Sequence, residues 1–196
     1  MPFIPPPPLK SGLFGFRGPA PAKPKPMAAA GTIAPPKPLA GVPIEHRIGV
    51  QAPAAVIWDV IYDLDRWEEW NPMYPKASGE IRIGQILDLT LVVPGQAPQQ
   101  IHPVVLDWVP GDQLHWRLTL LRGMVKTTRY IEIEQLGDES CIVSNGEIFG
   151  GLMGPSIAKR MGRAVRRGFV EMNEALKARA EVAWREAVAA PTSMAR

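Results

Sequence analysis

The sequence predicts an α+β fold in which a curved antiparallel sheet of about seven strands packs on a long C-terminal helix. Three observations predict it. Between residues 86 and 149, apolar and polar residues alternate in successive short segments, as in strands with one buried face. Short loops join these segments, and strands connected in this way are antiparallel. Only the segment 155–188 has the apolar spacing of a helix long enough to cover the sheet.

The first 43 residues have the composition of a disordered tail. They hold 13 of the 22 prolines, five basic residues and no acidic residue. They have no periodic apolar face, so burial cannot offset the entropy that ordering would cost. We therefore expect residues 1–43 to form a disordered, partly polyproline-II tail rich in Pro, Ala and Lys. Two interpretations stay open: a spacer, or a segment that docks to a protein partner through Phe3, Phe14 and Phe16.

The folded domain is expected over residues 44–188. Alternation over 44–50 predicts a first strand. Pro53 suits the first position of a helix, and an apolar stripe over 56–61 predicts that helix. A second small helix carries Trp67 and Trp70. These two small helices are expected to close one end of the sheet.

The remaining elements are six strands and the long helix. The strands are predicted near 77–81, 86–91, 103–108, 114–120, 130–134 and 141–149. The buried stripe of the helix is formed by Ile157, Met161, Val165, Phe169, Met172 and Leu176. Residues 189–196 are expected to be a flexible C-terminus. A bent sheet gripping a helix tends to leave a hollow between them, so we expect an internal cavity there.

Composition excludes several classes of function. The chain has 22 basic and 19 acidic residues, but residues 44–196 have 17 basic against 19 acidic, which argues against a nucleic-acid-binding module. The single cysteine, Cys141, excludes a disulfide framework and a cysteine-based zinc site. No apolar run approaches about 20 residues, so we expect no transmembrane segment. A cytoplasmic protein without a metal or another cofactor is the default expectation.

Turn positions predict two strand registers. Around the turn 110–112, the predicted pairs are Val109 with Gln113, Trp108 with Leu114, Leu106 with Trp116 and Val104 with Leu118. Asp107 then faces His115 on the other side of the sheet. Around the turn 137–139, the predicted pairs are Leu136 with Ser140, Ile133 with Val143, Ile131 with Asn145 and Arg129 with Glu147.

The second register predicts a charged pair on the side that faces the helix. Arg129 and Glu147 share the face of Ile131, and Trp116 should lie nearby on the next strand. A charged pair on an apolar face is costly unless it is matched. One interpretation is a structural ion pair at the rim of the cavity. The other is that Arg129 holds a carboxylate, enolate or carbonyl of a ligand, Glu147 orients it, and Asn145 adds a hydrogen bond.

Other candidate residues line the same expected cavity. His102 has the parity of Val104 and should face inward, either as a structural group or as an acid–base catalyst. Because His102 and His115 have opposite parity, they should not bind one metal. Met161 and Met172 on the helix are expected to form an adaptable cavity wall, and Phe169 is a further cavity candidate on the same helix.

Several motifs together resemble one superfamily. They are Ala52-Pro53 with Val56 and Trp58, Asp63 through Trp70-Asn71-Pro72, Gly79, Gly84, Leu114-His115-Trp116, Glu147-Ile148-Phe149-Gly150, and Gly168-Phe169 through Asn173-Ala175-Leu176-Lys177. Over residues 44–181 their order resembles the START-like, birch-pollen-allergen-like superfamily, also called SRPBCC or polyketide cyclase/dehydrase proteins. The resemblance implies the helix-grip fold and a cavity for a hydrophobic or amphipathic small molecule. It leaves the chemistry open.

Three functions follow as hypotheses. The first is a binder or carrier of a hydrophobic small molecule, such as a lipid, a quinone or a polyketide-like compound. The second is an enzyme of the polyketide cyclase/aromatase type, in which Arg129 stabilises enolate charge while Glu147 or His102 moves protons. The third is an interaction subunit that docks through its proline-rich tail. Peripheral contact with a membrane is compatible with the arginine-rich stretch 159–167.

Overall fold

The structure is a computed structural model that describes residues 40–189. Its elements are β1 (Val42–Val50), α1 (Ala54–Tyr62), η1 (Leu64–Glu69), β2 (Lys76–Ser78), β3 (Asp88–Leu91), β4 (Gln99–Ile101), β5 (Val104–Val109), β6 (Gln113–Leu120), η2 (Leu121–Gly123), β7 (Val125–Gly137), β8 (Ser140–Gly150) and α2 (Gly154–Ala189). The predicted tail lies outside the described residues except for 40–43, and β1 already begins at Val42. The predicted flexible C-terminus lies outside them too, except for Ala189, which ends α2.

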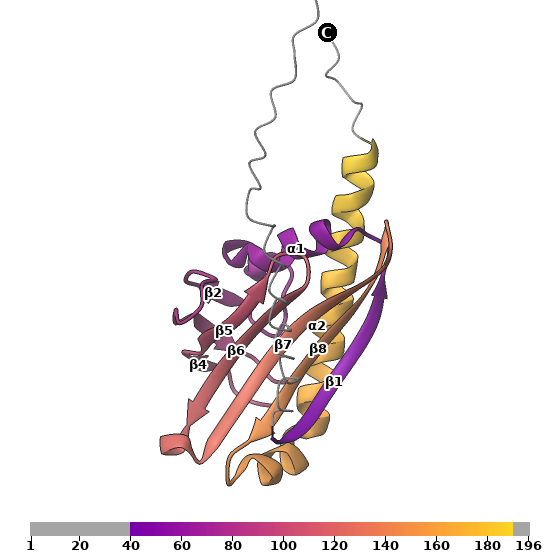
Figure 1. Ribbon diagram of the computed structural model, residues 1–196. Coiled ribbons are helices and arrows are strands. Elements are labelled where there is room, and N and C mark those ends of the chain that lie inside the picture. The colour runs from indigo at the N-terminus through magenta and orange to yellow at the C-terminus, as the bar shows by residue number, and fades with distance from the viewer. Residues whose placement is uncertain (1–39, 190–196) are drawn as a thin grey trace, which may run out of the picture. The chain divides into compact units, whose positions relative to one another are not determined.

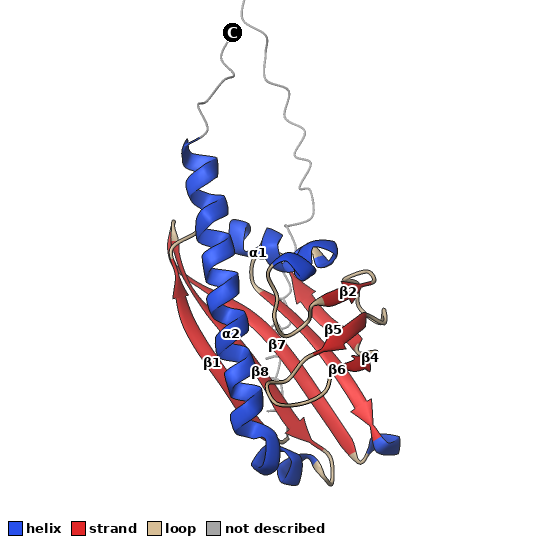
Figure 2. Ribbon diagram, turned by 180° about the vertical axis from the view of Figure 1, so that it is seen from behind, coloured by secondary structure: helices blue, strands red, loops and turns tan. Residues whose placement is uncertain are grey.

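The predicted α+β class and helix-grip architecture are confirmed. The main sheet is antiparallel with the order β1-β8-β7-β6-β5, and α2 lies along one face of it (Figures 1 and 2). The helices α1 and η1 follow the first strand, as expected. The described residues form eight strands, because the middle of the chain adds a smaller sheet, β2-β3-β4. The short strand β4 was not anticipated, since Gln99–Ile101 is too brief to show alternation.

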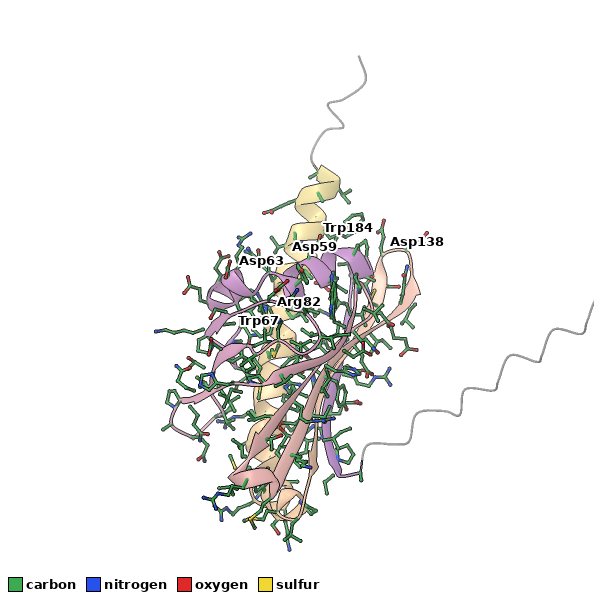
Figure 3. All side chains as sticks on the ribbon, turned by 60° about the vertical axis from the view of Figure 1, so that its left-hand side comes forward. Asp59, Asp63, Trp67, Arg82, Asp138 and Trp184 are labelled. Atoms are coloured by element: carbon green, nitrogen blue, oxygen red, sulfur yellow. The ribbon has the colours of Figure 1, made fainter. Side chains whose placement is uncertain are left out.

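The two ends of the main sheet differ in charge. The α1 end comprises α1, η1 and the turn between β7 and β8, and Figure 3 shows Asp59, Asp63 and Asp138 there. The η2 end comprises η2, the loop 151–153 and the first turns of α2 (Figure 1). The segments 113–131 and 148–170, which build the η2 end, contain no Asp or Glu. Carboxylates are therefore concentrated away from the η2 end.

The register of β7 and β8 is confirmed where it matters for the site. Arg129 lies opposite Glu147, Ile131 opposite Asn145 and Ile133 opposite Val143. The prediction that Leu136 pairs with Ser140 is wrong, because the register shifts beside the turn and Gly137 pairs with Ser140 instead. From Gln135 to Arg129 the pairing keeps the predicted register, so Arg129, Ile131 and Ile133 lie on the predicted face of the sheet.

The register of β5 and β6 is confirmed only near its turn. Val109 with Gln113, Trp108 with Leu114 and Asp107 with His115 pair as predicted, whereas Leu106 with Trp116 and Val104 with Leu118 do not. A bulge at Leu106 brings Val105 opposite Trp116. Because a bulge reverses the side-chain alternation before it, Val105 is buried and Val104 is exposed.

The core lies between the main sheet and α2. Phe169, Met172 and Leu176 of α2 have no exposed surface, and each contributes about 1.5–3 kcal/mol through burial. Trp67 of η1 is also fully buried and its indole N–H donates to the carbonyl of Ile61 at 3.0 Å. Large side chains thus fill much of the space in which we expected a hollow.

Candidate functional site

Arg129 is the centre of the candidate site. Its position on β7 turns the side chain toward α2, and only 2% of the residue is exposed. Its Nε donates to the hydroxyl of Tyr74 at 3.2 Å, and its Nη1 donates to the carbonyls of Gly146 at 2.8 Å and Tyr130 at 3.2 Å. Among the described residues, none of its partners is a carboxylate. The hydrogen bonds of this buried cation therefore go to carbonyl and hydroxyl dipoles, and the Glu147 carboxyl acts on it without a direct hydrogen bond.

Three aromatic rings surround the guanidinium of Arg129. The guanidinium carbon lies 4.1 Å from the ring centre of Phe169, 5.5 Å from that of Trp116 and 5.9 Å from that of Tyr74. Trp116 is the neighbour of Arg129 on β6. A desolvated cation over an aromatic face gains about 2 kcal/mol. The predicted proximity of Trp116 to Arg129 is confirmed. The contact with Phe169 comes from the structure, and Ile131 is buried nearby on β7.

One nitrogen of Arg129 is poorly satisfied. Among the described residues, Nη2 contacts only two thioether sulfurs, Met172 Sδ at 3.6 Å and Met73 Sδ at 3.8 Å. Sulfur is a weak acceptor, and methionine side chains adapt readily. The two N–H groups of Nη2 are therefore weakly satisfied cationic donors, and flexible side chains cover them. Asn71 Nδ2 is a buried neutral donor without a partner among the described residues.

Glu147 lies beside Arg129 but does not pair with it directly. The two residues are register partners, as predicted, yet the guanidinium is turned toward backbone carbonyls and aromatic rings. The carboxylate is held by the Thr127 hydroxyl instead, and the residue keeps part of its surface accessible. Burial raises the pKa of Glu147, against the opposing effects of Arg129 and of that hydrogen bond. A carboxyl of this kind can hold and release a proton closer to neutral pH.

A chain of polar groups crosses from the sheet to α2 next to Arg129. Asn145 Nδ2 donates to Asn173 Oδ1 at 2.9 Å, and Asn173 Nδ2 contacts His46 Nδ1 at 2.9 Å and the His46 carbonyl at 3.1 Å. Burial lowers the pKa of His46, and the nearby Arg166 lowers it further. Asn145 is fully buried and its Oδ1 has no partner among the described residues. This oxygen is a second unfulfilled group in the site.

Sequence reasoning missed Tyr74, Met73 and Asn173. Tyr74 and Met73 follow η1, where Asn71 Oδ1 accepts hydrogen bonds from both of their backbone N–H groups, at 3.0 and 3.1 Å. The Asn71-Pro72 pair signals such a turn, but nothing in the local sequence shows that the turn points at Arg129. Asn173 lies on the buried stripe of α2, four positions after Phe169, so its polarity at that spacing was a usable signal.

The prediction for His102 is wrong. Its side chain is exposed, and its Nδ1 lies 2.6 Å from Asp88 Oδ1. The bulge at Leu106 reverses the alternation that placed His102 inward. His115 faces outward as expected and pairs with Glu132 at 3.0 Å. Among the described residues, no group of three His, Cys, Asp or Glu side chains is arranged to hold a metal ion.

The expected enclosed hollow is not met around Arg129, where Trp116, Phe169 and Met172 pack tightly. Met161 is one of the apolar side chains that pack on the core but are only partly buried. Others on the η2 side of Arg129 are Ile44, Leu118 and Ile157, and the α1 end has Val56, Val60 and Trp184. The role of Met161 in a cavity wall stays a prediction.

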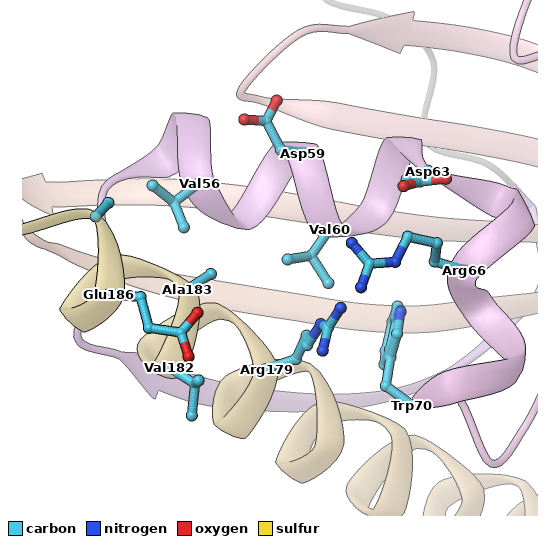
Figure 4. A pocket seen from close by; sticks show the side chains of 11 residues that line it. Val56, Asp59, Val60, Asp63, Arg66, Trp70, Arg179, Val182, Ala183 and Glu186 are labelled. Atoms are coloured by element: carbon cyan, nitrogen blue, oxygen red, sulfur yellow. The ribbon is translucent and has the colours of Figure 1, made fainter. Parts of the chain in front are cut away.

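A separate groove lies at the α1 end, between α1, η1 and the last turns of α2 (Figure 4). Its volume is about 480 Å³. Val56, Val60 and Val182 give it apolar walls. Arg66 and Arg179 reach its edge and both bond to Glu69 at 2.9 Å. The groove is open to solvent, and its lining also includes the carboxylates Asp59, Asp63 and Glu186. Solvent can satisfy its polar groups, unlike the buried Nη2 of Arg129.

Fold and site together define a helix-grip protein with a buried cationic centre. Residues 42–181 match the family model described as "Polyketide cyclase / dehydrase and lipid transport". The chain belongs to this family, as the resemblance implied. No curated protein has a sequence that matches this chain.

Solved structures share the fold at low sequence identity. The Zhui aromatase/cyclase from Streptomyces sp. R1128 is 21% identical with a TM-score of 0.60, over 78% of this chain and 99% of that one. A START superfamily protein from Mycobacterium smegmatis is 19% identical with a TM-score of 0.52, over 74% and 98%. Norcoclaurine synthase from Thalictrum flavum, solved with dopamine and hydroxybenzaldehyde, is 21% identical with a TM-score of 0.55, over 70% and 84%.

Proposed function

We propose that this protein binds a hydrophobic small molecule that carries a carbonyl, enolate or carboxylate oxygen. The observation that carries the proposal is Arg129 Nη2, a buried cationic donor whose only neighbours within bonding distance in the part of the chain that the structure describes are the sulfurs of Met73 and Met172. A ligand oxygen that displaces one thioether replaces a weak acceptor by a strong one. Hydrogen bonds to a charged group contribute about 1.5–3 kcal/mol. The apolar remainder of the ligand lies among the aromatic and methionine side chains.

Entry is expected from the η2 end. The partly buried side chains Leu118 and Met161 lie on that side of Arg129. Methionine adapts its shape at low cost, so Met161 and Met172 move before the aromatic rings do. Glu147 and the Oδ1 of Asn145, which has no partner among the described residues, lie beside Arg129 and would orient a second polar group of the ligand.

A matched pair of probes tests the anchor. 9-Fluorenone and fluorene have nearly the same shape, but only fluorenone has a carbonyl oxygen. Equilibrium dialysis of the full chain should show fluorenone binding more tightly, by about tenfold or more. Arg129→Met should remove that preference, while Arg117→Met, on the exposed face of β6, should keep it. Equal affinity of the two probes for the wild type, or a preference that survives in Arg129→Met, would contradict the proposal.

A second candidate function is cyclisation of a polyketide-like chain, and the raised pKa of Glu147 beside Arg129 favours it. Glu147 as carboxylate removes a proton from carbon next to a ketone, and Arg129 holds the enolate oxygen. The enolate carbon attacks a second ketone of the same chain, one C–C bond forms, and the new alkoxide takes the proton back from Glu147. His102 is excluded from this role because it is exposed and paired with Asp88.

The two functions separate in one experiment. A synthetic triketone, incubated with the protein and followed by chromatography, cyclises only if the second function holds. Glu147→Gln should then stop product formation and leave fluorenone binding within about twofold. If wild type binds fluorenone but forms no product, the binding function stands alone. The third hypothesis, docking through the proline-rich tail, falls on residues outside those described.

A further inference from the structure

The η2 end presents exposed apolar side chains at the tip of the domain. Leu121 is 59% exposed, Met124 43% and Leu152 84%. Two loops carry them, and these loops are joined, because the Met153 N–H donates to the Met124 carbonyl at 3.0 Å. The apolar groups therefore form one surface rather than scattered single residues. Surfaces of this kind mark sites of contact with a partner or a membrane.

The backbone is held in an unfavourable shape to form this tip. Leu121 and Arg122 both have φ in the left-handed region, at 50° and 54°. Such angles cost about 1 kcal/mol or more for residues other than glycine. Gly151, with φ 80°, supports the tip from the other loop, since a Cβ there would lie 2.6 Å from the Met124 carbonyl oxygen. Leu121 remains exposed in this conformation, so burial of its side chain does not offset the cost of the backbone angles.

Basic side chains surround the apolar tip. We name this surface the basic tip; it consists of Leu121, Arg122, Met124, Lys126, Leu152, Lys159, Arg160 and Arg163. All five of its basic residues are exposed. None of them has an ion-pair partner among the described residues, and the segments that form the tip contain no Asp or Glu. The first turn of the 36-residue helix α2 lies here as well, so its dipole adds positive potential.

We propose that the basic tip docks on the surface of a lipid bilayer that contains anionic lipids. Protruding leucine and methionine side chains enter the interface, and the lysines and arginines contact lipid headgroups with their charges while their stems stay in the apolar boundary. Each basic residue near an anionic surface strengthens binding by about fivefold. No helix among the described residues is long and apolar enough to span a membrane. The contact is therefore peripheral. The inference does not rest on the proposed function.

Vesicle co-sedimentation of the full chain tests the proposal. Binding to phosphatidylcholine vesicles that contain phosphatidylserine should exceed binding to pure phosphatidylcholine vesicles and should fall with salt. Leu152→Glu and Lys159→Glu should each weaken it about tenfold or more. Leu136→Glu, 61% exposed at the α1 end, and Arg185→Glu, late in α2, are the matched controls and should bind like wild type. The basic residues of 1–39 are the same in every variant, so differences among variants report on the tip.

A fluorescence measurement locates the contact. Cys141 is only 1% exposed and its Sγ lies 3.4 Å from the Ala52 carbonyl, so a cysteine introduced at position 152 is the reactive one. An environment-sensitive dye on Leu152→Cys should shift to the blue with anionic vesicles, whereas the dye on Leu136→Cys should not. Equal binding by Leu152→Glu and Leu136→Glu, or a dye at position 152 that stays in water, would overturn the proposal. Vesicle binding that no tip variant weakens would overturn it as well.

Discussion

Phe169 and Arg129 should be energetically coupled, and the coupling can be measured. The guanidinium carbon lies 4.1 Å from the ring centre of Phe169, closer than to the rings of Trp116 or Tyr74. Phe169→Leu keeps an apolar side chain but removes the ring. Repacking costs about 1 kcal/mol, and losing the cation–ring contact costs about 2 kcal/mol. The free energy of unfolding should fall by about 3 kcal/mol in total, and Tm should fall by about 6–12 °C.

A double-mutant cycle isolates the ring from the rest of the side chain. In the Arg129→Met background, Phe169→Leu should lose only the repacking part, which gives a coupling of about 2 kcal/mol. Phe149→Leu is the matched control, because Phe149 is a buried phenylalanine without a cation over its ring among the described residues. Denaturant unfolding of the four chains gives the values. A coupling below about 0.5 kcal/mol would refute the view that the ring of Phe169 stabilises the buried guanidinium of Arg129.

Three further results are expected. Because burial raises the pKa of Glu147 in the folded state, its stabilising effect is present below its unfolded pKa of about 4.3 and is lost as pH rises through the folded pKa. Glu147→Gln should therefore gain Tm relative to wild type as the pH rises above about 4.3, and a Tm difference that does not change with pH would contradict this. His46, whose pKa is lowered, should destabilise the fold below about pH 6.5, and His46→Gln should flatten that part of the pH profile measured by thermal unfolding. Gly146→Ala would place its Cβ 2.2 Å from the Tyr130 ring and should cost about 1–3 kcal/mol, whereas Gly49→Ala, with nothing near its Cβ, should be close to neutral in the same denaturant assay.

Most helices and strands and the fold class were predictable from the sequence, because consecutive alternating strands and one long amphipathic helix can pack together in only a few ways. The pairing of Arg129 with Glu147 followed from the turn at 137–139, and the bulge beside that turn did not disturb it. His102 shows where the reasoning fails. A single extra residue at Leu106 reverses every side chain before it, and neither a glycine nor a proline marks that bulge in the sequence.

The details of the site depend on contacts between residues distant in sequence. Tyr74 reaches Arg129 across 55 positions and Met172 across 43, and no local pattern encodes either contact. The expected ion pair with Glu147 is replaced by hydrogen bonds to the carbonyls of Gly146 and Tyr130, because strand register assigns a side chain to a face but does not fix its rotamer. The hollow was expected from the fold class alone, without regard to the side chains that meet there. Whether a hollow stays open depends on the size of the side chains that meet in it, and here the aromatic side chains of Trp116 and Phe169 close it around the cation.

A crystal structure of the full chain with 9-fluorenone tests the central claim most directly. The account predicts the carbonyl oxygen about 3 Å from Arg129 Nη2, with the side chain of Met73 or Met172 displaced from its present contact. Fluorenone bound in the groove between α1 and α2, or bound in the core with both sulfurs still against Nη2, would contradict it.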